Sequence, residues 1–128
     1  PIGMQVGLAT LKKISQEKIH SKLEERTKKF AASLKQKFKK HDLPFDVSTY
    51  ASIFWIHGQA NEPIRRIDQI PTEHAVRFQK FFHECLKRKI YLAPSGYEVG
   101  FISWAHTEEL LEQCADKMAE AAVAAISL

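Results

Sequence analysis

Apolar residues recur at helical spacing through the first third of the chain, and this pattern limits the fold more than any other feature. They stand three or four residues apart, or sums of these, at Leu8, Leu11, Ile19, Leu23, Phe30, Leu34 and Phe38. Such spacing places them on one side of a helix, with lysines opposite. It predicts helices over residues 3–14 and 16–41. Ser15 is the expected N-cap of the second helix, with Glu17 in its first turn.

Strand-like runs follow the second predicted helix, which is expected to end before Pro44. Residues 45–50 and 52–57 are rich in Val, Ile, Thr and aromatic side chains, which favours two short strands. Residues 58–71 contain Gly, Asn and two prolines, and they predict a loop long enough to be functional.

The second half of the chain repeats the alternation of helix and strand. Thr72 is expected to cap a helix that ends near Lys89, residues 90–92 and 99–105 to form two strands, and Thr107 to cap the last helix. The order is therefore helix, helix, two strands, helix, two strands, helix. It predicts an α+β fold in which helices cover one face of a small, mainly antiparallel sheet of about four strands.

The cysteines, histidines and aromatic residues are expected to serve packing rather than chemistry. Cys85 and Cys114 lie on apolar helix faces, and the six histidines show no metal-ligand spacing, so no metal site is predicted. The aromatic residues of the strand region are expected to pack on the sheet beneath the helices. They are Phe54, Trp55, Phe101 and Trp104.

Charge is distributed unevenly along the chain. Residues 12–40 hold eleven Lys or Arg against three Glu, a net charge of +8 within a chain of net charge +4. Such a stripe could bind nucleic acid, but no aromatic residues are interleaved with it, so the solvated outer face of a helix is the simpler interpretation.

Composition and length indicate one globular domain. The chain has 128 residues, of which 45% are hydrophobic and 27% charged. No apolar run of membrane-spanning length and no signal-peptide pattern is present, so we expect a cytoplasmic protein with no membrane partner. The sequence begins at Pro1 and reads at once as a packed helix, which suggests a piece of a longer protein.

Glu98 is the best candidate for chemistry. It stands in an apolar, strand-like stretch beside Val99 and Gly100, where a carboxylate must be paired, neutralised or turned toward a site. From composition alone, an ion pair or a solvent-facing strand edge is the simpler explanation. His106 precedes the Thr107 cap, and we expect it to form a local hydrogen bond.

Three stretches of the chain are distinctive: PIGMQVGLATL at residues 1–11, RFQKFFH at residues 77–83 and YLAPSGYEVGFISWAHT at residues 91–107. They resemble the C-terminal part of the glutamate-1-semialdehyde aminomutase family. The first resembles the family's Asn-Pro-x-x-Met-x-x-Gly helix start, and the third is the most specific match. Tyr97 stands where Phe is usual, Gly96 where a larger polar residue is common, and Ala51 where Gly is usual.

The resemblance implies a fold, a cofactor and a reaction. The family belongs to the class III aminotransferases of fold type I, whose C-terminal domain would correspond to residues 1–128, with a helical lead-in at 1–41 and the sheet layer at 42–128. Its members are homodimers that use pyridoxal 5'-phosphate to convert glutamate-1-semialdehyde to 5-aminolevulinate for tetrapyrrole (porphyrin) synthesis.

The same resemblance implies roles for individual residues. Glu98 would lie near the cofactor. Ser95 and Tyr97 are candidates for lining the substrate cavity, but residues 94–96 are equally explained as a plain turn and Tyr97 as a core ring. The Schiff-base lysine and the phosphate site lie upstream in the family, so this chain alone is expected to bind no cofactor and to be inactive. Its expected partners are the missing upstream part of the enzyme and a second copy.

Two other interpretations remain open from the sequence. One is the C-terminal domain of another class III aminotransferase. However, no Arg follows Arg88 to grip a substrate carboxylate, which favours the aminomutase over an ω-amino-acid aminotransferase. The other is a stand-alone binding module that uses the basic helix of residues 12–40.

Overall fold

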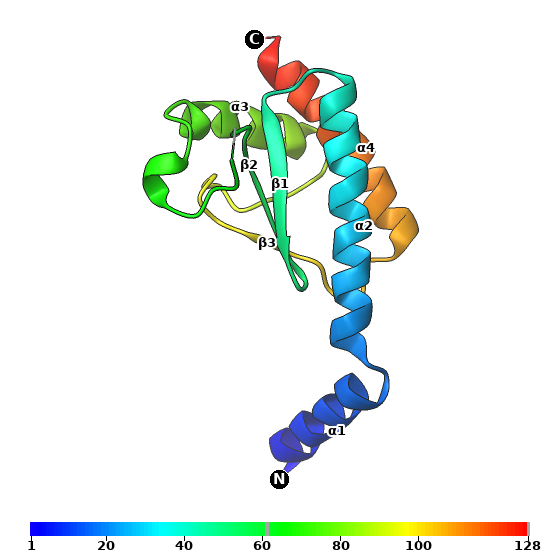
Figure 1. Cartoon of the computed structure of the whole chain (residues 1–128). Coiled ribbons are helices and arrows are strands. Elements are labelled where there is room, and N and C mark those ends of the chain that lie inside the picture. The colour runs from blue at the N-terminus through cyan, green and yellow to red at the C-terminus, as the bar shows by residue number, and fades with distance from the viewer. Residues whose placement is uncertain (61, 128) are drawn as a thin grey trace.

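The structure is a computed structural model that describes residues 1–60 and 62–127 (Figure 1). Its elements follow one another in the order α1 (Ile2–Gln16), α2 (Ile19–Lys40), β1 (Phe45–Tyr50), β2 (Ile53–Gly58), the 3-10 helix η1 (Ile67–Gln69), α3 (His74–Lys87), β3 (Gly100–Phe101) and α4 (Glu108–Ile126). Helices and a small antiparallel sheet are both present, which confirms the α+β class.

The sheet is antiparallel throughout, with strand order β1, β2, β3. β1 and β2 form a hairpin in which Phe45 pairs with Gly58 and Tyr50 with Ile53. Along β1, Phe45 and Val47 are buried against the helices while Ser48 is exposed on the opposite face. This alternation is the period-2 pattern of a strand with one covered face.

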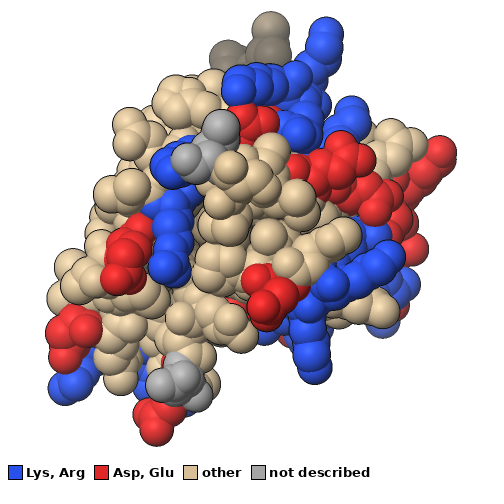
Figure 2. Space-filling model, turned by 90° about the horizontal axis from the view of Figure 1, so that it is seen from above, with Lys and Arg blue, Asp and Glu red and all other residues tan. Residues whose placement is uncertain are grey.

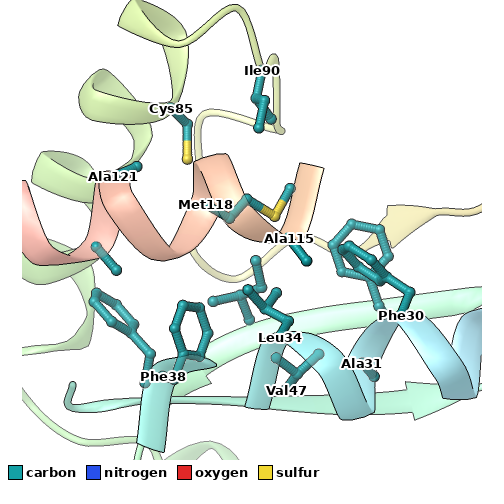
Figure 3. Packing of buried hydrophobic residues seen from close by; sticks show 14 of the residues in the cluster. Phe30, Ala31, Leu34, Phe38, Val47, Cys85, Ile90, Ala115, Met118 and Ala121 are labelled. Atoms are coloured by element: carbon teal, nitrogen blue, oxygen red, sulfur yellow. The ribbon is translucent and has the colours of Figure 1, made fainter. Parts of the chain in front are cut away.

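The core lies between the sheet and helices α2, α3 and α4 (Figure 3). Rings from separate elements meet there: Phe38 of α2 and Phe45 of β1 both contact Phe81 of α3, with centroids 6.5 and 5.2 Å from the Phe81 ring. α4 contributes mainly small residues, including Ala115 and Ala121, which lets it approach closely. The interior is thus a close-packed mixture of large rings and alanines.

α1 extends away from this body, and among the described helices and strands it contacts α2 alone (Figure 1). The break between the two helices lies at Lys18, which has a left-handed φ of 51°. The prediction that Ser15 caps the second helix is wrong. Ser15 lies inside α1, and its carbonyl oxygen accepts a hydrogen bond from the Lys18 N–H at 3.2 Å.

The predicted strand at residues 90–92 is wrong, which leaves three strands rather than about four. Lys89 adopts φ 63°, and the Ile90 N–H donates to the Cys85 carbonyl at 2.9 Å. A residue with positive φ and a hydrogen bond that spans five residues are the two features that close a helix C-terminus. Ile90 therefore ends α3 instead of starting a strand.

The predicted strand at residues 99–105 is reduced to β3, Gly100–Phe101. The Ile102 N–H still donates to the Ser52 carbonyl at 2.8 Å. Beyond it, the His106 N–H donates to the Ser103 carbonyl at 3.1 Å, which turns the chain toward α4 before a longer ladder can form.

The two predicted threonine caps have different outcomes. The Thr107 hydroxyl accepts a hydrogen bond from the Leu110 N–H at 3.1 Å, which confirms it as the N-cap of α4. Thr72 is not a cap. α3 begins after Glu73, whose side chain forms no capping bond, and the His74 N–H instead donates to the Pro71 carbonyl at 2.9 Å.

The packing predictions hold for some residues and fail for others. Phe54 and Cys85 are buried in the core, Trp55 is half-buried, and the half-buried Cys114 packs against the core. Phe101 and Trp104 are 64% and 39% exposed, so the prediction that they pack beneath the helices is wrong. β3 lies at the sheet edge, and residues after Ile102 leave the sheet.

Two kinds of feature are absent from residues 1–60 and 62–127. No helix there has the length and apolar character that a bilayer-spanning helix requires. Nor do three or more His, Cys, Asp or Glu side chains gather there as a set of metal ligands.

Candidate functional site

The segment between α3 and β3 carries all three predicted site residues on a surface turn. The Ser95 hydroxyl accepts a hydrogen bond from the Tyr97 N–H at 3.3 Å, and its carbonyl accepts one from the Glu98 N–H at 3.1 Å. Such hydroxyl-to-backbone bonds are typical of serine in turns. Ser95 therefore shapes the turn that presents Tyr97 and Glu98.

Gly96 is the point at which this turn is fixed to the rest of the fold. Its carbonyl accepts hydrogen bonds from Trp55 Nε1 of β2 and His74 Nε2 of α3, both at 2.7 Å. A Cβ atom on Gly96 would lie 2.7 Å from His74 Nε2 and 2.8 Å from Cγ of Phe78. Glycine is thus required here by close approach rather than by φ.

His74 anchors the turn from below. Because a carbonyl oxygen only accepts, His74 Nε2 donates this hydrogen bond. Nδ1 is buried without a hydrogen-bond partner among the described residues. The Tyr97 ring stands edge-on to the imidazole at 5.4 Å and remains 55% exposed. The predicted site residue Tyr97 therefore lies over the anchored imidazole of His74, and its ring is partly exposed to solvent.

Glu98 is exposed and lines the rim of an apolar cavity of about 300 Å³. The cavity floor comes from the core, and its lining includes Phe30, Phe54, Ile90, Val99, Leu111 and Met118. Within the part of the chain that the structure describes, Glu98 takes part in no ion pair. Its carboxylate is thus presented at the surface rather than neutralised by a neighbouring base.

The end of the segment is tied to α2. The Arg26 guanidinium lies 5.1 Å from the Trp104 ring centroid and donates Nη1 hydrogen bonds to the Trp104 and His106 carbonyls. His106 Nδ1 accepts from the Ser103 N–H at 2.9 Å, which confirms its local hydrogen bond. These contacts hold the C-terminal end of residues 91–107 on the body, and the Gly96 carbonyl holds the middle, so the turn is preorganised.

A second polar cluster was not predicted from the sequence. His57 Nδ1 donates to the Gly58 carbonyl at 2.8 Å, which leaves Nε2 to accept from the Ser48 hydroxyl, also at 2.8 Å. Burial lowers the pKa of His57 below its ordinary value. Asp46, Ser48 and His57 lie on one sheet face through the β1–β2 register, so a period-2 analysis of the two strands could have found the cluster.

Curated proteins similar to this chain include three bacterial proteins named glutamate-1-semialdehyde 2,1-aminomutase. The chain is 48% identical over 122 residues to the Bdellovibrio bacteriovorus protein, which covers 95% of the chain and 29% of that relative. It is 48% identical over 87% of its length to the Leptospira interrogans protein and 43% identical over 94% to that of Leptospira biflexa. The chain matches the C-terminal part of these proteins.

The chain belongs to the glutamate-1-semialdehyde aminomutase family and corresponds to the C-terminal part of its members. It spans only 25–29% of the length of these relatives. None of the family models searched matches the chain.

Solved structures of transaminases share its fold. An ω-transaminase from Sphaerobacter thermophilus superposes with a TM-score of 0.68 at 18% identity, over 84% of this chain and 24% of that one. A transaminase with PLP bound gives a TM-score of 0.65 at 19% identity, over 84% and 24%. These neighbours place the α+β layer of this aminomutase-family chain among pyridoxal-phosphate aminotransferase folds.

The lysines present in this chain do not fit a covalent cofactor site. A Schiff-base lysine needs an amine that loses its proton readily in a dry pocket. Here every lysine is exposed except Lys37, which is half-buried. Hydrogen bonds to Asp116 and Glu112 raise the pKa of Lys37, and one to Glu108 raises that of Lys29. These amines are held in the protonated state.

Proposed function

We propose that this chain acts as the C-terminal domain of a glutamate-1-semialdehyde 2,1-aminomutase, which converts glutamate-1-semialdehyde to 5-aminolevulinate for tetrapyrrole synthesis. The 48% identity over 95% of the chain carries this proposal. In the parent enzyme, a cytoplasmic homodimer, pyridoxal phosphate would supply the electron sink for the amino-group shift. Its lysine and phosphate site would come from the upstream part.

Within that enzyme, the turn at residues 94–99 would face the cofactor. The exposed Glu98 carboxylate would stabilise a cationic nitrogen or orient a donor, and its effect would grow once the upstream part excludes water. Tyr97 and Ser95 would border the substrate cavity, with Ser95 acting through the turn it shapes. The anchoring of Gly96 to Trp55 and His74 supports this, because catalytic geometry needs a rigid base.

A chimera tests this function directly. The chain would replace the corresponding C-terminal part of the Bdellovibrio bacteriovorus relative, and the purified chimera would be assayed for formation of 5-aminolevulinate. We expect turnover by the chimera and none by the chain alone. The chain alone, mixed with pyridoxal phosphate and dialysed, should retain no visible absorption band. A chimera that folds and binds the cofactor but forms no product would contradict the proposal.

Replacing Glu98 with Gln in that chimera isolates its role. We expect a changed ratio of the absorption bands of the aldehyde and amine forms of the cofactor, together with a lower kcat. The matched control is Glu109→Gln, an exposed carboxylate in the first turn of α4. If both variants keep the spectrum of the parent, Glu98 is a surface residue without a role at the cofactor.

The transaminase-like fold makes an ordinary aminotransferase domain the second candidate. The absence of Arg after Arg88 argues against it, since an arginine is the natural partner for a second substrate carboxylate. The chimera separates the two functions. Amino transfer between an ω-amino acid and a keto acid, without the internal shift, would favour the aminotransferase.

The contacts of α2 argue against a nucleic-acid module. Lys37 pairs with Glu112 and Asp116 of α4, Lys35 pairs with Asp46 of β1, and Lys29 pairs with Glu108. Figure 2 shows basic and acidic side chains next to one another on the face seen from above. Much of the basic stripe is thus neutralised within the fold, which leaves less positive charge for a phosphate backbone.

A further inference from the structure

α1 has the composition of a buried helix and the position of an exposed one. Residues 1–11 contain no charged side chain, which is unusual for three turns of helix in water. Yet no residue of α1 is buried, and Ile2, Met4 and Leu11 are 81%, 82% and 66% exposed. An apolar surface of this kind marks a contact that another structure covers.

The apolar residues of α1 form two stripes rather than one. Met4, Leu8 and Leu11 follow the spacing i, i+4, i+7 and continue to Ile14, which packs against the core. Ile2, Val6 and Ala9 repeat that spacing two residues earlier, which places them about 200° away around the helix. A single flat surface cannot cover both stripes, so α1 needs neighbours on two sides.

The glycines of α1 indicate how near a neighbour can come. Gly3 and Gly7 stand one turn apart beside Met4 and Leu8, and apart from their chain neighbours and the helix backbone, no described atom lies within 4 Å of where either Cβ would be. In a free helix these glycines only weaken the helix. Against a packed partner, they let another backbone approach closely.

We infer that α1 is a docking helix that inserts into the upstream part of the parent aminomutase, which covers both stripes over residues 2–11. This inference rests on the proposed function. The chain matches the C-terminal part of its relatives, so roughly three quarters of each relative's length precedes the match. α1 is the element directly continuous with that part. At the other end of α1, Ile14 packs against the core of the body.

Thiol accessibility in the chain and in the chimera tests this docking. Met4→Cys and Val6→Cys place one thiol in each stripe, and Lys12→Cys is the control beyond the uncharged segment. All other cysteines are replaced, and the rate of reaction with a thiol reagent is measured. In the chain alone, the three thiols should react at similar rates. In the chimera, the thiols at 4 and 6 should react at about one tenth of that rate or lower, while the thiol at 12 keeps the rate it has in the chain alone.

The outcomes separate docking from function. Thiols at 4 and 6 that stay fast in an active chimera overturn the docking helix and leave the function standing. Protected thiols in a chimera without turnover support docking and contradict the function. Protection in the chain alone that grows with concentration overturns the inference in favour of a second copy as the occupant.

Two negative charges introduced together into α1 give an independent test. Val6→Asp and Leu8→Asp together should leave the thermal unfolding of the chain alone nearly unchanged, because neither side chain is buried there. The same pair should prevent soluble expression of the chimera, whereas Lys12→Asp should not. A soluble, active chimera with both aspartates would overturn the inference.

Discussion

α1 and α2 follow one another in the chain and both carry regularly spaced apolar residues, yet only α2 has buried its apolar face. Ile19, Leu23, Phe30, Leu34 and Phe38 of α2 lie in the core, whereas α1 has no buried residue. The spacing specifies a helix and the side it will bury, but it does not specify where the covering partner comes from. For α2 the partners are α4 and β1; for α1 they lie outside this chain, by our inference.

The largest expected difference between the two helices is the cost of losing a leucine. Leu34 is fully buried, so Leu34→Ala should lower the free energy of unfolding by about 2–5 kcal/mol through lost burial and a residual cavity. Leu8→Ala in α1 should change it by less than about 0.5 kcal/mol. Urea unfolding of both variants measures this. A similar loss in both would show that α1 packs on the body in solution.

A glycine pair should give effects of opposite sign. In Gly100→Ala the new Cβ would lie 2.2 Å from the Phe54 ring, which is itself buried, so the variant should lose about 1–3 kcal/mol. Gly7→Ala in the open α1 should gain up to about 1 kcal/mol from helix propensity. Thermal unfolding of both variants checks the signs. A destabilising Gly7→Ala in the isolated chain would mean that α1 already has a close neighbour.

Substitutions at two of the predicted cap residues, Thr107 and Ser15, should differ more modestly in their effect on the free energy of unfolding. Thr107→Ala removes the side-chain acceptor for the Leu110 N–H and should cost about 1 kcal/mol. Ser15→Ala, at the junction of α1 and α2, should cost close to nothing because the break there is made by the backbone at Lys18. If urea unfolding shows the same loss of stability in both variants, Ser15 acts as a cap.

The smallest expected effect is a pH dependence that belongs to the packed part of the molecule. Because the folded pKa of His57 lies below 6.5, the unfolded chain takes up this proton first as the pH falls. The stability contributed by the neutral ring is therefore present above about pH 6.5 and is lost as the pH falls toward the lowered value.

Urea unfolding at pH 7.5 and 5.5 measures that loss. His57→Gln should reduce it, whereas His20→Gln, on the exposed side of α2 near α1, should not. If the free energy of unfolding falls by the same amount between pH 7.5 and 5.5 in both variants, His57 is not the source of the pH dependence.

Local residue patterns predicted much of the fold and only part of the site. The β1–β2 hairpin, the helix ranges and the Thr107 cap were predictable, because each depends on neighbours a few residues away. The strand at residues 90–92 was not, because Ile90 closes α3 through a positive φ at Lys89, a conformation that lysine seldom adopts. At Ala51, φ is 50°, which explains why glycine would suit that turn.

The candidate site shows the same division. Glu98 could be singled out because a carboxylate in an apolar stretch needs a reason, but the cavity beside it also draws on distant residues such as Phe30 and Phe54. Trp55 and His74 hold the turn through the Gly96 carbonyl, a contact across 41 and 22 residues that no local pattern encodes.

The sequence by itself determined the four helices, the strands β1 and β2, the family and the one carboxylate worth testing, since periodicity, turn residues and motif identity act over short range. The tertiary structure decided which apolar faces are covered, which strands pair and how rigidly Glu98 is presented. Those outcomes depend on contacts between distant residues, whose burial and hydrogen bonds exist only once the chain has folded.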